Sequence, residues 1–267
     1  MTRLVVCLLA GGVAAAASAQ TITDPSVRPS SATQQPAAAD EHPLAPAVRM
    51  AEDAVKAAEA VPTYTATLYR KVLLNGQFAE STVRMKYRTT PKSVYLYFVQ
   101  PHAGREALWI EGWNDGNMLA HEGSGVASLI GSVSLAPDSP QAMEGSKNPI
   151  TRSGLAEMGR TVLEQWREEM KYGEVSAKLF PEATLDGVPC RVIETTHPQP
   201  RKEFAFHKTR LFLTRDTGVP FAVQQLGWPR QAGGQPPVLE DYRYRDLRLN
   251  AGLTPQDFDP RNPAYAF

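Results

Sequence analysis

The fold is decided by residues 63–88, which read TYTATLYRKVLLNGQFAESTVRMKYR. Residues 63–74 are rich in Tyr, Thr and Val, and residues 77–88 alternate apolar with polar side chains. Both patterns are typical of β-strands. Asn75 and Gly76 lie between them, and an Asn-Gly pair favours a two-residue hairpin turn because both residues tolerate positive φ. The stretch therefore predicts an antiparallel β-hairpin.

Further segments with strand character lie outward from this hairpin. Each is short, and turn-forming pairs such as Asp186-Gly187 separate several of them. Because short turns join consecutive strands, the pattern favours an antiparallel sheet over a doubly wound parallel one. We predict strands over Ser93–Val99, Glu106–Glu111, Asn117–His121, Glu174–Phe180, Cys190–Thr196, Phe204–Thr214, Pro220–Trp228 and Val238–Asn250.

Two other segments have helical periodicity, with apolar residues recurring every three or four positions. This spacing predicts amphipathic helices over Leu44–Val61 and Arg152–Tyr172, the second capped by Thr151 or Ser153. A sheet of about nine strands tends to curl. We therefore predict an α+β fold, in which a strongly curved antiparallel sheet forms an incomplete barrel and the helices pack on its concave side.

The N-terminal region indicates export. Residues 1–19 carry Arg3, an apolar run and small residues at Ala17-Ser18-Ala19, as in a cleavable signal peptide. Residues 20–43 are rich in Pro, Ser, Ala, Gln and Thr, which predicts a disordered leader. A single domain is expected over residues 44–267. No later segment has the apolar length of a membrane span, so we expect a soluble protein in the periplasm or another extracytoplasmic compartment.

Composition excludes some partners and frameworks. Lys and Arg together number 28, and so do Asp and Glu, so the formal net charge is zero. This balance gives no basic excess, and we expect no nucleic-acid partner. Cys7 lies in the signal segment, which leaves Cys190 without a disulfide partner. We interpret Cys190 as a small buried apolar residue.

Two stretches resemble a known family. One runs from Arg105 to Gly116 and reads REALWIEGWNDG. The other combines LEDYRY at residues 239–244, LNAGL at residues 249–253 and DFDP at residues 257–260. Together they resemble DUF1571, an uncharacterised family of exported bacterial proteins, over about residues 44–267.

The order of strands and helices also resembles the lipoprotein-carrier fold of periplasmic LolA-like proteins. That resemblance implies a curved, incomplete antiparallel barrel whose helices cover an apolar cavity that takes acyl chains. It concerns architecture only, because no carrier-specific motif is present and a fold does not by itself imply a function.

Aromatic and aliphatic residues are the main candidates for a ligand cavity, although the same residues fill the core of many proteins. On the carrier hypothesis the cavity residues are Tyr95, Tyr97, Trp109, Leu155, Val162, Trp166, Phe212 and Trp228. The predicted function is non-enzymatic binding or carriage of an apolar ligand, either a lipid or the acyl chain of a lipoprotein. A hydrolase with a dispersed site and a structural envelope protein with a filled core remain the alternatives.

The Arg105–Gly116 segment offers polar residues of unknown role, namely Arg105, Glu106, Glu111, Trp113, Asn114 and Asp115. Strand alternation places Glu106 and Glu111 on opposite faces, which disfavours a catalytic carboxylate pair. The five histidines are scattered and match no zinc motif. No Gly-x-Ser-x-Gly motif is present. We therefore predict no catalytic residues, no metal and no cofactor.

Overall fold

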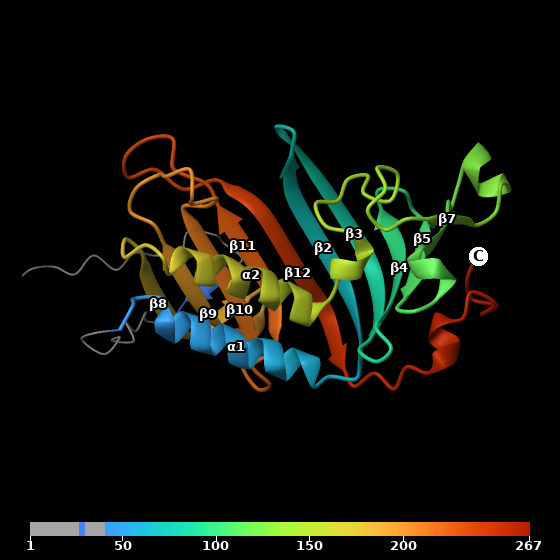
Figure 1. The fold of residues 1–267 in the computed structure, drawn as a ribbon, viewed down its shortest axis with the longest axis horizontal. Coiled ribbons are helices and arrows are strands. Elements are labelled where there is room, and N and C mark those ends of the chain that lie inside the picture. Colours follow the sequence, from blue (N-terminus) through green and yellow to red (C-terminus); the bar gives the residue numbers. More distant parts are fainter. Residues whose placement is uncertain (1–26, 30–40) are drawn as a thin grey trace, which may run out of the picture.

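The computed structural model describes residues 27–29 and 41–267. Within them, one antiparallel sheet of twelve strands and two α-helices form the framework (Figure 1). The helices are α1 (Ala45–Glu59) and α2 (Leu155–Glu169). The strands are β1 (Val27–Pro29), β2 (Thr63–Leu74), β3 (Gln77–Arg88), β4 (Ser93–Gln100), β5 (Glu106–Ile110), β6 (Met118–His121), β7 (Val133–Leu135), β8 (Ser176–Leu185), β9 (Val188–Thr196), β10 (Lys208–Thr214), β11 (Pro220–Leu226) and β12 (Val238–Leu249).

The quoted hairpin lies in the middle of the sheet. Its strands pair in unbroken register from Thr63 opposite Arg88 to Leu74 opposite Gln77. Asn75 and Gly76 have positive φ values of 49° and 81°, as the predicted turn requires. The hairpin prediction is confirmed.

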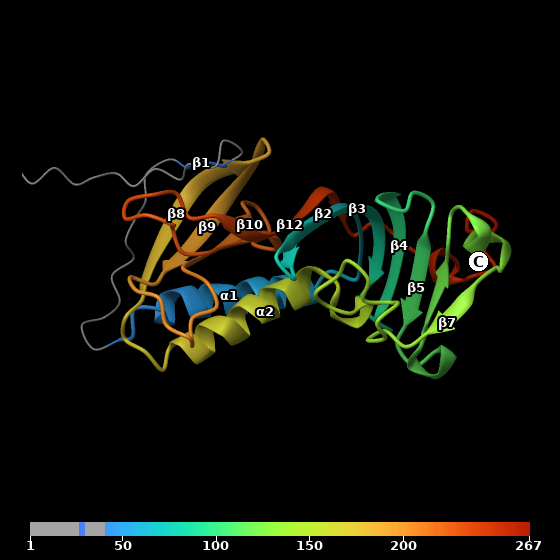
Figure 2. The same cartoon turned by 90° about the horizontal axis from the view of Figure 1, so that it is seen from above.

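The strand order is β1-β8-β9-β10-β11-β12-β2-β3-β4-β5-β6-β7, and every neighbouring pair is antiparallel. The last strand, β12, pairs with the first long strand, β2, and thereby joins the C-terminal strands to the central hairpin. Figure 2 shows the sheet arching over the helices. The edge strands β1 and β7 do not pair with each other, so the barrel is incomplete, and the predicted α+β fold is confirmed.

Both helices lie side by side on the concave side, over the β8–β12 half of the sheet (Figures 1 and 2). Their apolar faces form a packed core with the sheet, in which Val48 of α1 and Trp166 of α2 share a cluster with Ile193 and Leu211. Neither described helix combines the length and the apolar character that a membrane span requires. The helices therefore fill this half of the concavity.

The other half of the concave face, on β3–β7, is covered by a long connection instead. This connection runs from residue 122 to residue 153 and includes the short helices η2 (Val126–Leu129) and η3 (Ile150–Arg152) as well as β7. On the convex side, the chain after β12 returns over the sheet, and Phe258 of η4 (Pro255–Phe258) packs with Tyr95 and Leu108. The two halves of the concave face thus have different covers.

Two expectations about local structure need correction. Val27–Pro29, inside the segment expected to be a disordered leader, forms β1 and pairs with residues 183–185 of β8, because the edge of β8 offers unpaired backbone groups. The rest of the leader and the signal segment lie outside the described residues, apart from residues 41–43. Neither Thr151 nor Ser153 caps α2, whose N-cap is Gly154.

Candidate functional site

A pocket of about 400 Å³ lies between the concave face of β4–β7 and the 122–153 connection. Its sheet wall is apolar because alternate residues of each strand point to this face. The wall residues are Leu96, Phe98, Ala107, Met118, Ala120, Val133 and Leu135. A volume of this size falls in the range of about 300–1,000 Å³ that is typical of small-molecule sites.

The connection is held over the pocket by Arg105. Its guanidinium lies 2.7 Å from a carboxylate oxygen of Glu122 and 3.2 Å from one of Glu144. The backbone also crosses closely here, since a Cβ on Gly123 would lie 2.3 Å from the carbonyl carbon of Gly104. The ion pairs and the close crossing fix the start of the connection beside β4 and β5.

The part of the connection above the pocket carries exposed apolar side chains. Val126 is 81% exposed, Leu129 is 84% exposed and Ile130 is 72% exposed. Ala127 and Ile130 of the same segment line the pocket. Apolar groups that contact water therefore lie at the mouth of the pocket. Three exposed aliphatic side chains in so short a segment are unusual.

A second, smaller pocket of about 70 Å³ lies between α2 and strands β2, β11 and β12. Arg70, Ser146, Asn148 and Ser153 belong to the walls of both pockets, so the two spaces adjoin at these residues. The junction is polar, whereas the sheet wall of the large pocket is apolar. The site thus has an apolar sheet wall, a polar end, and the charged Arg105, Glu122 and Glu144 where the connection meets the sheet.

Two tyrosines of the sheet hold the N-terminus of α2 at this junction. The Tyr64 hydroxyl accepts a hydrogen bond from the Leu155 N–H at 3.0 Å, and the Tyr244 hydroxyl accepts one from the Gly154 N–H at 3.1 Å. Gly154 has φ +123°, and a Cβ there would lie 2.7 Å from the Tyr87 ring. These bonds replace the Ser or Thr cap that the sequence predicts.

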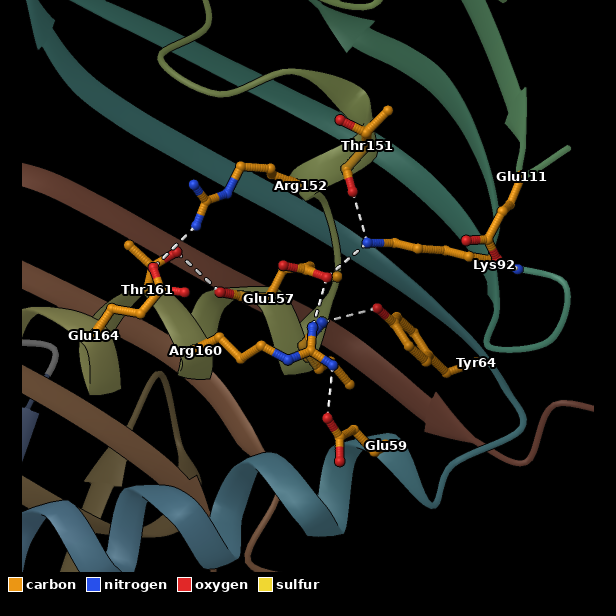
Figure 3. A network of polar contacts seen from close by, with 12 residues as sticks. Glu59, Tyr64, Lys92, Glu111, Thr151, Arg152, Glu157, Arg160, Thr161 and Glu164 are labelled. Carbon is orange, nitrogen blue, oxygen red and sulfur yellow. Dashed lines mark hydrogen bonds and ion pairs between the residues drawn. The ribbon is translucent and has the colours of Figure 1, made fainter. Parts of the chain in front are cut away.

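Charged residues on the outer side of α2 add a second anchor (Figure 3). Lys92 donates to Glu157 at 2.8 Å, and Arg160 donates to Glu157 and to Glu59 of α1, each at 2.6 Å. Burial raises the pKa of Glu157, but the hydrogen bond and charge of Lys92 and the charge of Arg160 outweigh it, so the net pKa lies below its usual value. The network joins the β3–β4 turn, α1 and α2.

The far end of α2 carries a buried contact between a histidine and a glutamate. The His197 Nε2 lies 3.2 Å from a Glu169 carboxylate oxygen, and both side chains are almost fully buried. Gln165 donates to the same carboxylate at 2.8 Å. None of these three residues lines either pocket of the site, so the pair secures α2 on the sheet.

The structure separates the eight residues expected to line one cavity. Val162 lines the small pocket, whereas Leu155 and Trp166 are buried in the packed core under α2. Trp109 is also a core residue, and its indole donates to the Gly116 carbonyl at 3.1 Å. None of these four lines the large pocket.

The other four expected cavity residues lie away from both pockets. Tyr95 and Tyr97 lie on the opposite face of the sheet, with Tyr95 stacked on Tyr265 at 4.1 Å. Phe212 is fully buried, and Trp228 packs against His207. Tyr95 and Tyr97 instead line a pocket of about 600 Å³ on that opposite face. The eight expected residues therefore do not share one cavity, and their role in binding stays a prediction. Tyr95 and Tyr97 alternate with Leu96 and Phe98, and it is the latter pair that lines the large pocket.

The Arg105–Gly116 segment divides between the site and its support. Arg105 and Glu106 both line the large pocket, and a carboxylate oxygen of Glu106 also accepts the Ala266 N–H of the C-terminal tail at 3.2 Å. Glu111 accepts the Lys92 N–H at 3.3 Å. Trp113, Asn114 and Asp115 form the turn before β6, and Asn114 donates to Ser134 of β7 at 3.0 Å. No pair of carboxylates converges here.

Other chemistry is sparse in the described part of the chain. No group of three or more His, Cys, Asp or Glu residues within residues 27–29 and 41–267 could hold a metal ion. Cys190 is free and buried, as interpreted from the sequence, and burial raises the pKa of its thiol to about 11.

Reasoning from the sequence missed Arg70 at the junction of the two pockets, because Arg70 occupies a strand position like any other polar residue.

Comparisons with known proteins identify a family and a fold. The family model described as "Protein of unknown function (DUF1571)" matches residues 61–267. No curated protein sequence matches this chain. Similar solved structures include the MucA/MucB complex of Pseudomonas aeruginosa, with 17% identity, TM-score 0.47 and coverage of 80% of this chain and 61% of that chain.

Two further solved structures are similar over most of their length. Lipoprotein LppX of Mycobacterium tuberculosis has 9% identity and TM-score 0.39, covering 80% of this chain and 100% of that chain. A LolA superfamily protein of Nitrosomonas europaea has 10% identity and TM-score 0.22, covering 79% of this chain and 96% of that chain. At these identities the likeness concerns the fold alone.

Proposed function

The chain belongs to the DUF1571 family, and from the geometry of its concave face we propose that it binds the acyl chain of a lipid or lipoprotein without catalysing a reaction. The observation that carries the proposal is the pocket of about 400 Å³ walled by apolar side chains of β4–β7. Apolar walls favour an apolar occupant, because burying hydrocarbon removes it from water.

The expected gain is large enough for useful affinity. Each buried methylene contributes about 0.8 kcal/mol. A chain with about ten buried methylenes would gain ~8 kcal/mol, which corresponds to a dissociation constant on the order of a micromolar before the cost of association. The pocket does not need polar contacts to hold such a ligand.

The mouth of the pocket supports binding and release. Exposed Val126 and Leu129 provide an apolar rim, and Ile130 continues from the rim into the pocket wall. An acyl chain that enters over this rim remains in contact with apolar groups. The charged groups at the edge are engaged with each other, since Arg105 pairs with Glu122 and Glu144. This arrangement supports binding rather than chemistry.

We also place the site of action outside the cytoplasm. The support for this is the pattern of residues 1–19, with Arg3, an apolar run and small residues before Gln20. A lipid carrier of this kind would act between membranes or at the surface of one.

The experiment compares two tryptophan substitutions on β6. Ala120 lines the pocket, whereas Leu119 pairs with Leu108 and points to the opposite face. We expect Ala120→Trp to fill pocket space and weaken binding of a fluorescent fatty-acid analogue about tenfold or more, the equivalent of two lost methylenes. Leu119→Trp, the matched control, should bind like the wild type.

The purified wild-type protein should also release lipid into organic solvent, detected by mass spectrometry. If no lipid is extracted and the wild type shows no saturable binding of the analogue, the carrier function is rejected. If both tryptophan variants bind like the wild type, the ligand lies elsewhere and the assignment of this pocket is wrong.

A further inference from the structure

Arg70 is a charged residue in an apolar row. Alternation along β2 places Ala66, Leu68, Arg70 and Val72 on the concave face, where the other three are buried core residues. The guanidinium lies at the junction of the two pockets and belongs to the walls of both. Arg70 itself is only half-buried, so part of its guanidinium remains open to the pockets.

The partners that Arg70 has are neutral. Its Nε donates to the Ser81 hydroxyl at 2.9 Å, and its Nη1 donates to the Ser146 hydroxyl at 3.2 Å. A guanidinium has five N–H donors, so three remain for water or a ligand, and no nitrogen of Arg70 is a buried atom without a partner. Within the described residues no carboxylate lies within 4.0 Å of it, and the neighbouring acid Glu240 is paired with Lys147.

The two arginines that are buried in the described residues differ from the half-buried Arg70. Arg210 pairs with Glu194 at 2.8 Å, and Arg243 pairs with Asp241 at 2.7 Å. Burial lowers the pKa of Arg70 from its usual value, which is the direction expected of a desolvated cation without a carboxylate beside it. Arg210 and Arg243 thus have carboxylate partners, whereas the partners of Arg70 are hydroxyl groups.

The space beside Arg70 matches the size of an acidic group. The small pocket of about 70 Å³ has polar walls at this end, including Ser146, Asn148 and Ser153. A single water needs about 10–15 Å³ of such volume, so the pocket accommodates several oxygen-sized atoms. The apolar body of the large pocket begins on the other side of the same residues.

From this geometry we infer that Arg70 binds the anionic head group, a carboxylate or a phosphate, of an amphiphile whose acyl chain lies in the large pocket. The inference rests on the proposed function and adds the chemistry of the ligand's polar end. Guanidinium forks bind planar or tetrahedral oxyanions through two parallel N–H bonds. The ligand's negative charge then supplies the partner that the fold does not.

The experiment uses two probes with the same chain. Binding of dodecanoate and of dodecanol to the purified full chain is measured by displacement of a fluorescent fatty-acid analogue. In the wild type, dodecanoate should bind about 10- to 100-fold more tightly, the value expected for hydrogen bonds to a charged group. In Arg70→Gln the preference should disappear, while dodecanol affinity stays unchanged.

Further variants separate head-group recognition from a structural role. Arg70→Lys keeps the charge without the fork and should retain part of the preference. Lys71→Gln, the matched control, removes a cation from the opposite face of the same strand, where Lys71 pairs with Glu80, and should retain all of the preference. Circular dichroism and melting curves establish that each variant is folded, and the wild-type comparison of the two probes needs no variant at all.

The outcomes are distinguishable. If the wild type binds neither probe, the proposed function fails. If it binds both equally, or if Arg70→Gln keeps the preference for dodecanoate, the carrier function stands and this inference is overturned. Inorganic phosphate tests the other source of the anion. Phosphate can bind at Arg70 without displacing the fluorescent analogue from the large pocket. If phosphate binds there as tightly as dodecanoate binds, the site takes a free anion and not an amphiphile.

Discussion

Replacement of Tyr64 by phenylalanine tests how the sheet positions α2 at the site. The Tyr64 side chain is 1% exposed, and its hydroxyl accepts the Leu155 N–H at 3.0 Å. Tyr64→Phe removes this acceptor but keeps the ring that stacks on Tyr87 at a centroid distance of 4.6 Å. The substitution therefore isolates one hydrogen bond at the start of the helix.

The expected loss follows from the burial of the donor. Without the hydroxyl, the Leu155 N–H has no partner in an apolar environment, which costs about 1–3 kcal/mol in the free energy of unfolding. For a chain of this size, each kcal/mol lowers the melting temperature by about 2–4 °C. Because Leu155 begins α2 beside the small pocket, the binding of dodecanoate should weaken as well.

Urea denaturation followed by circular dichroism measures the effect, with Tyr69→Phe as the control. Tyr69 is on the same strand, and its hydroxyl donates to Glu80 at 3.3 Å on the exposed face. The control should change stability by less than about 0.5 kcal/mol. If Tyr64→Phe is no less stable than Tyr69→Phe, the tyrosine does not cap α2 and the reasoning is refuted.

Four further predictions test other parts of the structure. Cys190 should react slowly with a thiol reagent in the folded protein at pH 8, because burial raises its pKa to about 11, and rapid labelling before unfolding would contradict the buried placement. The pKa of Glu157 is lower in the folded protein than in the unfolded chain, where it is about 4.3. Its ionised form therefore stabilises the fold at pH values above the unfolded pKa, and this stabilisation is lost as the pH falls through the folded pKa. Glu157→Gln should therefore flatten the acid side of the stability profile, and a wild-type acid slope in this variant would show that the network in Figure 3 is unimportant. Gly123→Ala should lower the melting temperature, because its Cβ would lie 2.3 Å from the carbonyl carbon of Gly104. In the control Gly173→Ala, the new Cβ meets no atom within 4 Å, so equal melting temperatures of the two variants would argue against the close crossing. In its source cell the mature protein should begin at Gln20, as N-terminal sequencing can establish, and an intact Met1 would reject export.

The sequence alone determined the two helices and the longer strands of this fold, but it predicted neither β1 nor β7. The hairpin of residues 63–88 follows from alternation and from Asn75-Gly76, and its predicted bounds match β2 and β3. The helix predictions extend one to three residues beyond the observed ends of α1 and α2. Local periodicity and turn chemistry carry this information, because each element of this chain buries one face according to its own pattern.

The candidate site was decided by the tertiary structure. Ser93–Gln100 is apolar on both faces, so its sequence does not show that Leu96 and Phe98 enter the pocket while Tyr95 packs under the C-terminal tail. That assignment depends on which face the distant tail covers.

The cap of α2 and the surroundings of Arg70 also depend on residues that are far apart in the sequence. The α2 N–H groups find Tyr64 and Tyr244 across the sheet rather than a neighbouring Thr or Ser. Arg70 is more exposed than the paired Arg210 and Arg243, and no described carboxylate forms an ion pair with it. A sequence records which side chains are present along a strand. Whether a buried charge has a partner depends on strands and loops far apart in the chain, and only the folded protein brings these together.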